Sequence, residues 1–209
     1  MKVIGITGPT GAGKTTALKE IERLGGRVLD ADAVYHRLLA EDQSLQLQLE
    51  SMFGPLWDGH GAIDRKKLGA IVFGDPKKLS DLNTVTHRAV GGRIHSLLKE
   101  YETQGCPLAA IDAIALLESG LGERCDVTVA VTAPPEVRVR RIMAREGISE
   151  DYARARVAAQ KPDDFYIGGC DYALVNDCAT AEEFAARAGE LFQQILERQD
   201  RGLSGGESI

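Results

Sequence analysis

The sequence predicts an α/β protein in which a five-stranded parallel sheet is wrapped by helices. Short apolar runs rich in β-branched residues alternate with longer helical stretches along the 209 residues. This alternation is typical of parallel strands joined by crossover helices. The apolar fraction of 44% and charged fraction of 27% are ordinary for a globular protein with a buried core. We expect strands at 2–7, 27–30, 108–112, 127–132 and 172–176.

The predicted helices follow from periodicity and from residues that suit helix starts. Asp64, Ser149 and Thr180 each precede such a stretch, and Thr180 forms a capping box with Glu183. Residues 42–105 interrupt the strand rhythm, which suggests a helical insertion packed beside the sheet. Residues 200–209 hold three glycines and two serines and are predicted to be disordered. We expect helices at 14–24, 33–41, 44–53, 66–73, 76–104, 134–145, 149–160 and 181–198.

The segment 8–15 reads Gly-Pro-Thr-Gly-Ala-Gly-Lys-Thr, a complete G-x-x-x-x-G-K-[ST] phosphate-binding loop. Its glycines let consecutive N–H groups point at an anion, and the following helix adds its positive end. Lys14 supplies a charge for the β- and γ-phosphates, and the Thr15 hydroxyl can ligate Mg²⁺. The alternative is a glycine-rich turn that matches by chance. A strand before the loop and a helix after it favour a nucleoside triphosphate site, with Gly8 at its start.

Two acids, Asp30 and Asp32, follow the second predicted strand. The carboxyl ends of parallel strands face the ligand crevice, and alternate residues of an extended chain point the same way. One carboxylate could accept a proton from an attacking hydroxyl while the other organises Mg²⁺. The alternative is that Asp32 only caps the next helix.

Other patterns are less specific. The run 108–112 resembles a Walker B strand that ends in Asp112, but many buried strands end in an acid. No N-K-x-D sequence is present, which disfavours a regulatory GTPase. Phosphoryl-transfer enzymes often close cations over the γ-phosphate with a helical lid, although surface arginines are more often solvated. Arginines crowd two predicted helices, at positions 138, 140, 141, 145, 154 and 156, and the first, third and fourth of them share a face.

Composition restricts the partners and the compartment. The formal net charge of −6 disfavours a protein that grips nucleic acid. No stretch has the length of a membrane span, so we expect no membrane association. The four cysteines lack zinc-ligand spacing and are expected to be reduced thiols in a cytoplasmic protein, although a disulfide between Cys170 and Cys178 is conceivable.

In order and spacing, these residues resemble the dephospho-CoA kinase family over positions 1 to about 198. The resemblance rests on motifs along the whole chain: Gly8 with Lys14-Thr15-Thr16, Val28 to Asp32, Phe53-Gly54, Ile63-Asp64-Arg65, Val72-Phe73, Leu116 to Gly120, Ala133-Pro134, Arg145, Ala159-Gln160, Asp171 and Asn176. Three departures bear on the acceptor pocket: Ile114-Ala115-Leu116 replaces a Pro-Leu-Leu segment, Arg88 replaces a proline, and Pro9 stands where glycine is frequent.

The resemblance implies a P-loop NTPase fold like that of nucleoside monophosphate kinases. It implies one kinase domain over 1–199, with an acceptor-binding helical insertion at 42–105 and a lid at 138–165. The implied reaction transfers the ATP γ-phosphate to the ribose 3′-hydroxyl of dephospho-CoA, the last step of coenzyme A synthesis. Oligomeric state stays open, with a monomer expected.

By position, the resemblance assigns roles to particular residues. Asp32 is the expected base and contacts the acceptor with Arg65 and His87, and Arg145 is the lid arginine. The expected contacts to ATP are Gly11, Ala12, Gly13, Lys14, Thr15, Thr16 and, at the adenine, Asn176. Alternatives are a P-loop kinase for another nucleoside or nucleotide-like metabolite, and a non-catalytic nucleotide-dependent switch.

Overall fold

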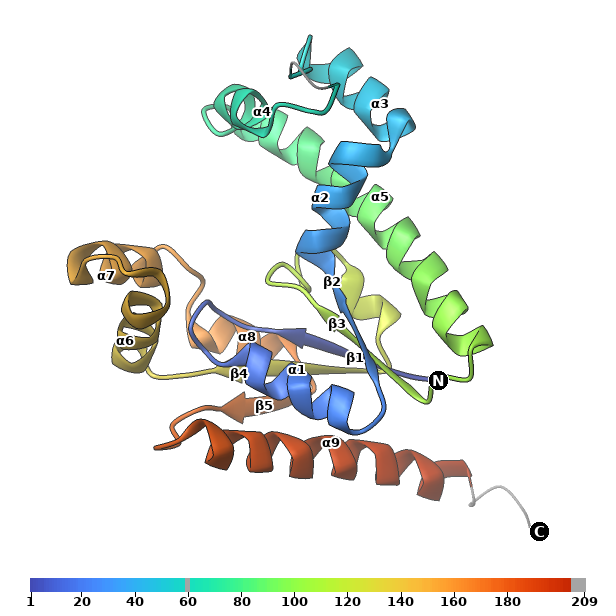
Figure 1. Cartoon of the computed structure of the whole chain (residues 1–209), viewed down its shortest axis with the longest axis vertical. Helices are drawn as coiled ribbons and strands as arrows, with labels where there is room; N and C mark the ends of the chain where they lie inside the picture. The colour runs from blue at the N-terminus through green and yellow to red at the C-terminus, as the bar shows by residue number, and fades with distance from the viewer. Residues whose placement is uncertain (59–60, 204–209) are drawn as a thin grey trace. The chain divides into compact units, whose positions relative to one another are not determined.

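The computed structural model describes residues 1–58 and 61–203, and Figure 1 labels their helices and strands. The chain divides into two compact units. The first unit combines residues 1–28 with the described residues from 101 onward, and the second is Leu29–Glu100. Among the described residues, no helix is both long and apolar enough to cross a membrane.

The described strands form one five-stranded sheet in the order β2-β3-β1-β4-β5. Strand β1 (Lys2–Thr7) pairs in parallel with β3 (Leu108–Asp112) and with β4 (Val127–Thr132), which pairs in parallel with β5 (Tyr172–Val175). Strand β2 (Arg27–Asp30) is an edge strand. The predicted fold class is therefore confirmed, and all predicted strand bounds agree except that β5 ends one residue early.

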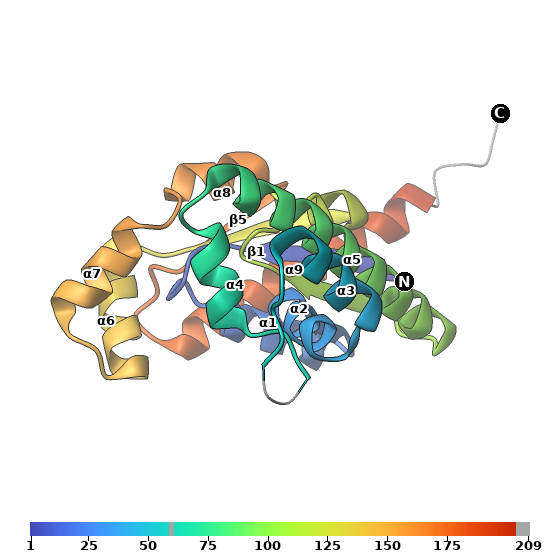
Figure 2. The ribbon, with the colours of Figure 1, turned by 90° about the horizontal axis from the view of Figure 1, so that it is seen from above.

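The sheet of the first unit carries helices on both faces. Helices α1 (Lys14–Arg23) and α9 (Ala181–Leu203) share a core with alternate residues of the strands, including Ile4 and Val129. Thr128 lies on the opposite face of β4, where it bonds Asp171 just after α8 (Asp163–Gly169). Figure 2 shows α8 and α1 on opposite sides of β1. Helices α6 (Pro135–Glu146) and α7 (Glu150–Ala158) form a smaller cluster around Ile142 and Ala153.

The second unit is built from four helices around a separate leucine-rich core. They are α2 (Ala31–Glu41), α3 (Gln43–Phe53), α4 (Arg65–Val72) and α5 (Pro76–Thr103), the last of which continues into the first unit. Asp42 caps α3 and Asp64 caps α4, each with a carboxylate that accepts backbone N–H groups. The core contains Leu39, Leu45, Leu49, Leu56, Ile63, Leu68, Val72 and Leu82.

Three local predictions are wrong. Helix α8 and the 3₁₀ helix at Leu121–Arg124 were not expected, because both are short and contain glycine, which obscures their periodicity. Helix α9 continues through Leu203, beyond its predicted end at residue 198. The glycine- and serine-rich composition begins only at Gly202, and a helix that is already formed propagates easily by a turn. The remainder of the predicted tail, 204–209, lies outside the described residues.

Candidate active site

The phosphate-binding loop between β1 and α1 adopts a conformation that demands glycine. Gly8 has a φ of 138°, and a Cβ there would lie 1.9 Å from the carbonyl oxygen of Val131. Gly13 has a φ of 110°, and a Cβ there would lie 2.3 Å from Nδ2 of Asn176. Gly13 is also the N-cap of α1 and offers no side-chain cap, so the positive end of the helix faces the loop. The backbone is therefore shaped to hold an anion.

Lys14 and Thr15 lie in an open pocket of about 350 Å³ beside this loop. The Lys14 ammonium donates a hydrogen bond of 2.9 Å to the carbonyl of Gly8, which folds the side chain over the loop. Asp112, at the end of β3, lines the same pocket as the Thr15 hydroxyl. A hydroxyl and a carboxylate beside a phosphate site are oxygen ligands that suit Mg²⁺. The other lining residues are Pro9, Thr10, Gly11, Gly13, Ile114, Arg141, Arg145 and Arg156.

Asn176 is buried directly behind the loop, only 3% exposed. Its Nδ2 donates to the carbonyl of Ala12 at 2.8 Å, and its Oδ1 accepts from Arg141 at 3.1 Å. Arg141 also donates to the carbonyls of Gly11 and Ala12. Burial lowers the pKa of Arg141 from its ordinary value, and a second arginine, Arg140, adds to the effect. Asn176 and Arg141 therefore hold the carbonyl side of the loop, which leaves its N–H side for phosphate.

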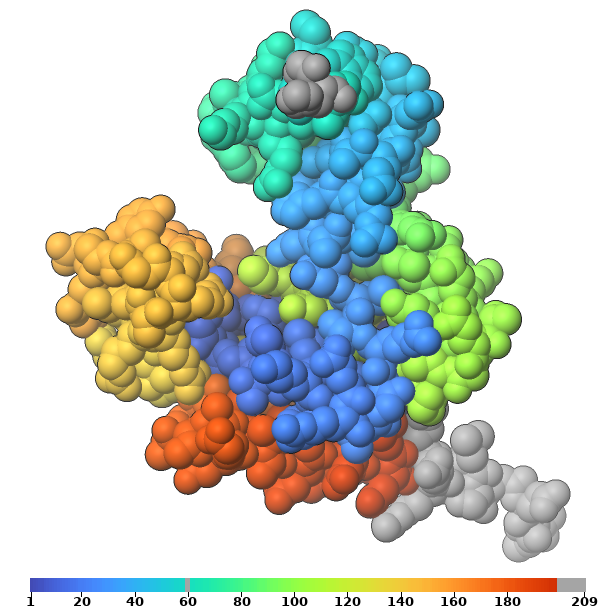
Figure 3. All heavy atoms as spheres, viewed as in Figure 1, coloured from blue at the N-terminus to red at the C-terminus, as the bar shows by residue number. Residues whose placement is uncertain are grey.

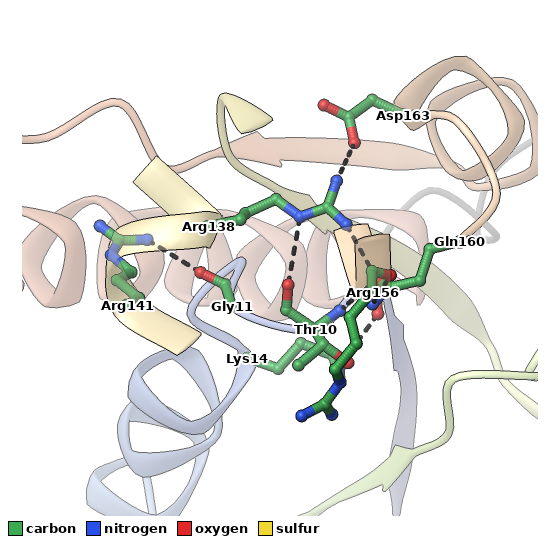
Figure 4. A network of polar contacts seen from close by, with 9 residues as sticks. Thr10, Gly11, Lys14, Arg138, Arg141, Arg156, Gln160 and Asp163 are labelled. Atoms are coloured by element: carbon green, nitrogen blue, oxygen red, sulfur yellow. Dashed lines mark hydrogen bonds and ion pairs between the residues drawn. The ribbon is translucent and has the colours of Figure 1, made fainter. Parts of the chain in front are cut away.

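A second arginine of α6, Arg138, also holds the loop and is fully buried, only 3% exposed. Its Nε donates to the carbonyl of Thr10 at 3.1 Å, its Nη2 to Oε1 of Gln160 at 2.8 Å, and its Nη1 to Asp163 at 3.4 Å. Figure 4 shows the guanidinium between these three partners. Burial lowers the pKa of Arg138, and Asp163 opposes that shift. Of the arginines expected to share a face, Arg138 supports the loop and does not line the phosphate pocket.

Arg145 and Arg156 line the phosphate pocket from the ends of α6 and α7. One carboxylate, Glu146, accepts hydrogen bonds from both: 2.6 Å from Arg145, and a very short contact from Arg156. These bonds lower the pKa of Glu146 below its ordinary range. The side chains of α6 and α7 lie directly against the N-terminal residues (Figure 3). Two positively charged side chains, the exposed Arg145 and the half-buried Arg156, therefore line the site from the segment predicted to be a lid.

The carboxylates expected at the end of β2 do not lie on an extended chain. Helix α2 begins at Ala31, and Asp30 is its N-cap, whose carboxylate accepts the N–H of Ala33 at 2.9 Å. Asp32 lies in the first helical turn and is exposed. The prediction that both acids point the same way along a strand is wrong, because Asp30 satisfies the helix start two residues early. The alternative, in which Asp32 only caps the next helix, is excluded for the same reason, because Asp30 is the N-cap.

Arg65 and His87 belong to the second unit, as Asp32 does. Arg65 is the first residue of α4 and is exposed, and His87 is half-buried on α5. The Arg65 charge acts on the phenol of Tyr35 and partly offsets the burial that raises the Tyr35 pKa. The second unit therefore carries a cation and a histidine together with Asp32, and the first unit carries the phosphate-binding groups.

Two residues of the site were not predicted from sequence. Asp112 was visible only as an acid after an apolar strand, and its place beside Thr15 follows from the pairing of β3 with β1. Gln160 was a motif residue of the family resemblance but was given no role, because its bond to Thr10 joins residues 150 positions apart.

The amino-acid sequence is similar to those of known proteins along most of its length. The family model of dephospho-CoA kinase matches residues 2–182. A dephospho-CoA kinase of Dehalococcoides mccartyi is 35% identical over 179 residues, which is 85% of this chain and 90% of that protein. Another, from Geobacter sulfurreducens, is 35% identical over 193 residues, 92% of this chain and 98% of that protein.

Solved structures agree in fold. TT1252 from Thermus thermophilus has a TM-score of 0.75 at 33% identity, covering 93% of this chain and 97% of that one. A dephospho-CoA kinase from Campylobacter jejuni has a TM-score of 0.68 at 25% identity, covering 95% of this chain and all of that one. A shikimate kinase from Bacteroides thetaiotaomicron, with a TM-score of 0.53 at 15% identity, shares the fold alone.

Proposed function

The chain belongs to the dephospho-CoA kinase family, and we propose that it uses ATP and Mg²⁺ to phosphorylate the ribose 3′-hydroxyl of dephospho-CoA in the cytoplasm, with the residues assigned below. The family reaction is an ATP-dependent phosphoryl transfer to an alcohol that yields coenzyme A. The observation that carries the assignment is the pocket in which Lys14, Thr15, Asp112 and Arg145 meet beside the phosphate-binding loop.

The loop and its cations position the triphosphate. The N–H groups of Gly11, Ala12, Gly13 and Lys14 and the start of α1 at Thr15 and Thr16 bind the phosphates, with Gly8 providing the turn. The Lys14 ammonium exchanges the Gly8 carbonyl for the β- and γ-phosphates. Asn176 supports the adenine side of the site by holding the loop at Ala12.

Charge must be neutralised as the γ-phosphoryl group moves. Thr15, with Asp112 lining the same pocket, would hold Mg²⁺, and the ion would supply positive charge beside the phosphate oxygens. Arg145 and Arg156 approach the same oxygens from the lid, and the triphosphate replaces Glu146 as their counter-ion. Positioning and electrostatics of this kind account for most of the rate in phosphoryl transfer.

Asp32 accepts the proton of the acceptor hydroxyl. In the first turn of α2 its exposed carboxylate is presented to solvent and has no role in capping, which Asp30 performs. Arg65 and His87, from the same unit, bind the acceptor. The Arg65 guanidinium can pair with a phosphate group of the acceptor, and the His87 ring nitrogens can form hydrogen bonds with one of its polar groups.

A product assay tests the function. Purified protein with ATP and Mg²⁺ is offered dephospho-CoA and, separately, a panel of nucleosides and nucleotides. We expect ADP release only with dephospho-CoA, and a product heavier by one phosphoryl group in mass spectrometry. ADP release with a nucleoside and none with dephospho-CoA would contradict the acceptor.

The base is tested by Asp32→Asn. The variant should keep its affinity for ATP and lose turnover by about 10²–10⁴-fold, the range for a general base. Asp30→Asn is the matched control, because asparagine also caps helices well, and its turnover should stay close to that of the wild type. Unchanged turnover in Asp32→Asn would refute the assignment.

A further inference from the structure

Gln160 lies two residues beyond α7 and uses both ends of its side-chain amide. Its Oε1 accepts the backbone N–H of Thr10 at 2.8 Å and Nη2 of Arg138 at 2.8 Å. Its Nε2 donates to the carbonyl of Arg156 at 3.2 Å, one of the last carbonyls of α7 that have no partner within the helix. One amide therefore joins the phosphate-binding loop, helix α6 and the end of helix α7.

The backbone of Thr10 is held on both sides by this arrangement. Oε1 of Gln160 accepts the Thr10 N–H, and Nε of Arg138 donates to the Thr10 carbonyl. Because Arg138 also bonds Gln160 directly, the three residues form a closed ring of hydrogen bonds (Figure 4). The ring fixes the orientation of the two peptide planes that meet at the Cα of Thr10, immediately before Gly11, where the loop turns to present its N–H groups.

Anion binding by such a loop depends on N–H groups that already point inward. Gly11, next to the ring, has a φ of 83°, so the chain there has wide conformational freedom unless its neighbours restrain it. The ring supplies that restraint from outside the loop. It also connects the loop to α7, whose Arg156 side chain lines the phosphate pocket.

We propose that Gln160 and Arg138 are positioning residues that preorganise the loop for the ATP phosphates and anchor the end of α7, and its Arg156, to that loop. Neither residue needs to touch the nucleotide. The inference rests on the proposed function for the identity of the nucleotide, and it adds how the two sides of the phosphate site are held together.

The test compares ATP binding by Gln160→Met and Gln160→Glu, measured calorimetrically with Mg²⁺ and no acceptor. Methionine has a similar length but offers the Thr10 N–H and Arg138 no oxygen, so the dissociation constant should rise about tenfold. Glutamate keeps an oxygen acceptor for both groups and should recover most of the affinity. In steady-state assays, the KM for ATP should follow the same order, and the KM for dephospho-CoA should change less than about twofold.

Gln46 is a matched control in the second unit. Gln46 is buried and, like the half-buried Gln160, donates its Nε2 to helix-end carbonyls, in this case those of Leu39 and Ala40 in its own unit. Gln46→Met should lower the melting temperature as Gln160→Met does, with ATP affinity unchanged. A general loss of stability is thereby separated from a loss of loop positioning.

Arg138→Met, alone and combined with Gln160→Met, completes the design. Since both side chains act on the backbone of one residue, Thr10, and bond each other, the double variant should bind ATP about as weakly as the weaker-binding single variant. Wild-type affinity in Gln160→Met, no recovery in Gln160→Glu, or effects that multiply in the double variant would each overturn the proposal. If the wild type binds ATP but never phosphorylates dephospho-CoA, the proposed function fails while the binding comparison still decides the inference.

Discussion

Arg138 and Arg145 lie on the same helix, α6, and near the same loop, but their surroundings differ. The Arg138 side chain is 3% exposed, and it forms hydrogen bonds with three protein groups, on Thr10, Gln160 and Asp163. The Arg145 side chain is 59% exposed, and its hydrogen bond in the structure goes to its neighbour Glu146. Seven residues along one helix therefore separate an arginine that belongs to the framework from one that faces the pocket.

The comparison shows how the site combines rigidity with response. A buried arginine with several partners is costly to displace, so it holds a conformation. An exposed arginine with one carboxylate partner loses little by exchanging it for a phosphate, so it can follow charge as it moves. Two arginines on one predicted face of the same helix therefore serve different purposes, and the burial of each side chain decides which purpose it serves.

Lys14→Met should have the largest effect, because Lys14 is the positively charged residue of the phosphate-binding loop itself. We expect kcat/KM to fall by about 10³-fold, with weaker ATP binding and slower turnover together. The free energy of unfolding should change little, since Lys14 is only half-buried. Steady-state kinetics and urea denaturation check both statements, and an unaffected enzyme would contradict the role of the loop.

Arg145→Met should lower kcat and leave the stability of the protein nearly unchanged. We expect kcat to fall by about 10²-fold, while the free energy of unfolding changes by less than about 0.5 kcal/mol, as is usual for exposed positions. Arg140→Met, an exposed arginine of the same helix that does not line the phosphate pocket, is the control and should keep its turnover. Equal losses in both variants would remove the distinction.

Arg138→Met should show the reverse pattern. The change removes the Arg138 donor from the Thr10 carbonyl, from Oε1 of Gln160 and from Asp163, and we expect the free energy of unfolding to fall by about 2–3 kcal/mol. At saturating ATP, kcat should stay within a few-fold of the wild type. A stable variant with strongly reduced kcat at saturation would instead place Arg138 among the residues that touch the reacting phosphate.

Glu146→Gln should have the smallest effect, visible as a pH dependence. The hydrogen bonds from Arg145 and Arg156 lower the Glu146 pKa, so its contribution to stability is complete above the unfolded value of about 4.3 and is lost as pH falls through the lower folded value. Urea denaturation of wild type and variant should therefore differ by a constant amount near neutral pH. The two curves should converge at acidic pH, and a gap that widens there would contradict the ion pair.

Much of the fold could be predicted because its signals are local. Apolar runs such as Val3-Ile4-Gly5-Ile6 and Val127 to Thr132 indicate buried parallel strands without knowledge of their partners. Asp64 and Thr180 mark helix starts through bonds to residues two or three positions away. Predictions failed where a signal was ambiguous over a few residues, as at Asp30 and Asp32, either of which could cap α2.

The polar side chains that hold the phosphate-binding loop in place could not be predicted in the same way. Arginines 138 and 145 have the same chemistry and lie on the same predicted face, and nothing near them in sequence says which is buried. Asn176 was assigned by resemblance, but its bond to Ala12 joins residues 164 positions apart. The bond of Thr10 to Gln160 spans 150 positions.

The amino-acid sequence alone determined the parallel sheet, the phosphate-binding loop and the family, because glycine spacing and apolar periodicity act through the local backbone. Only the tertiary structure decided which polar side chains hold that loop and which face its pocket. The reason is that the free energy of a charged or amide group depends on its burial and its partners, and both are supplied by distant segments of the chain.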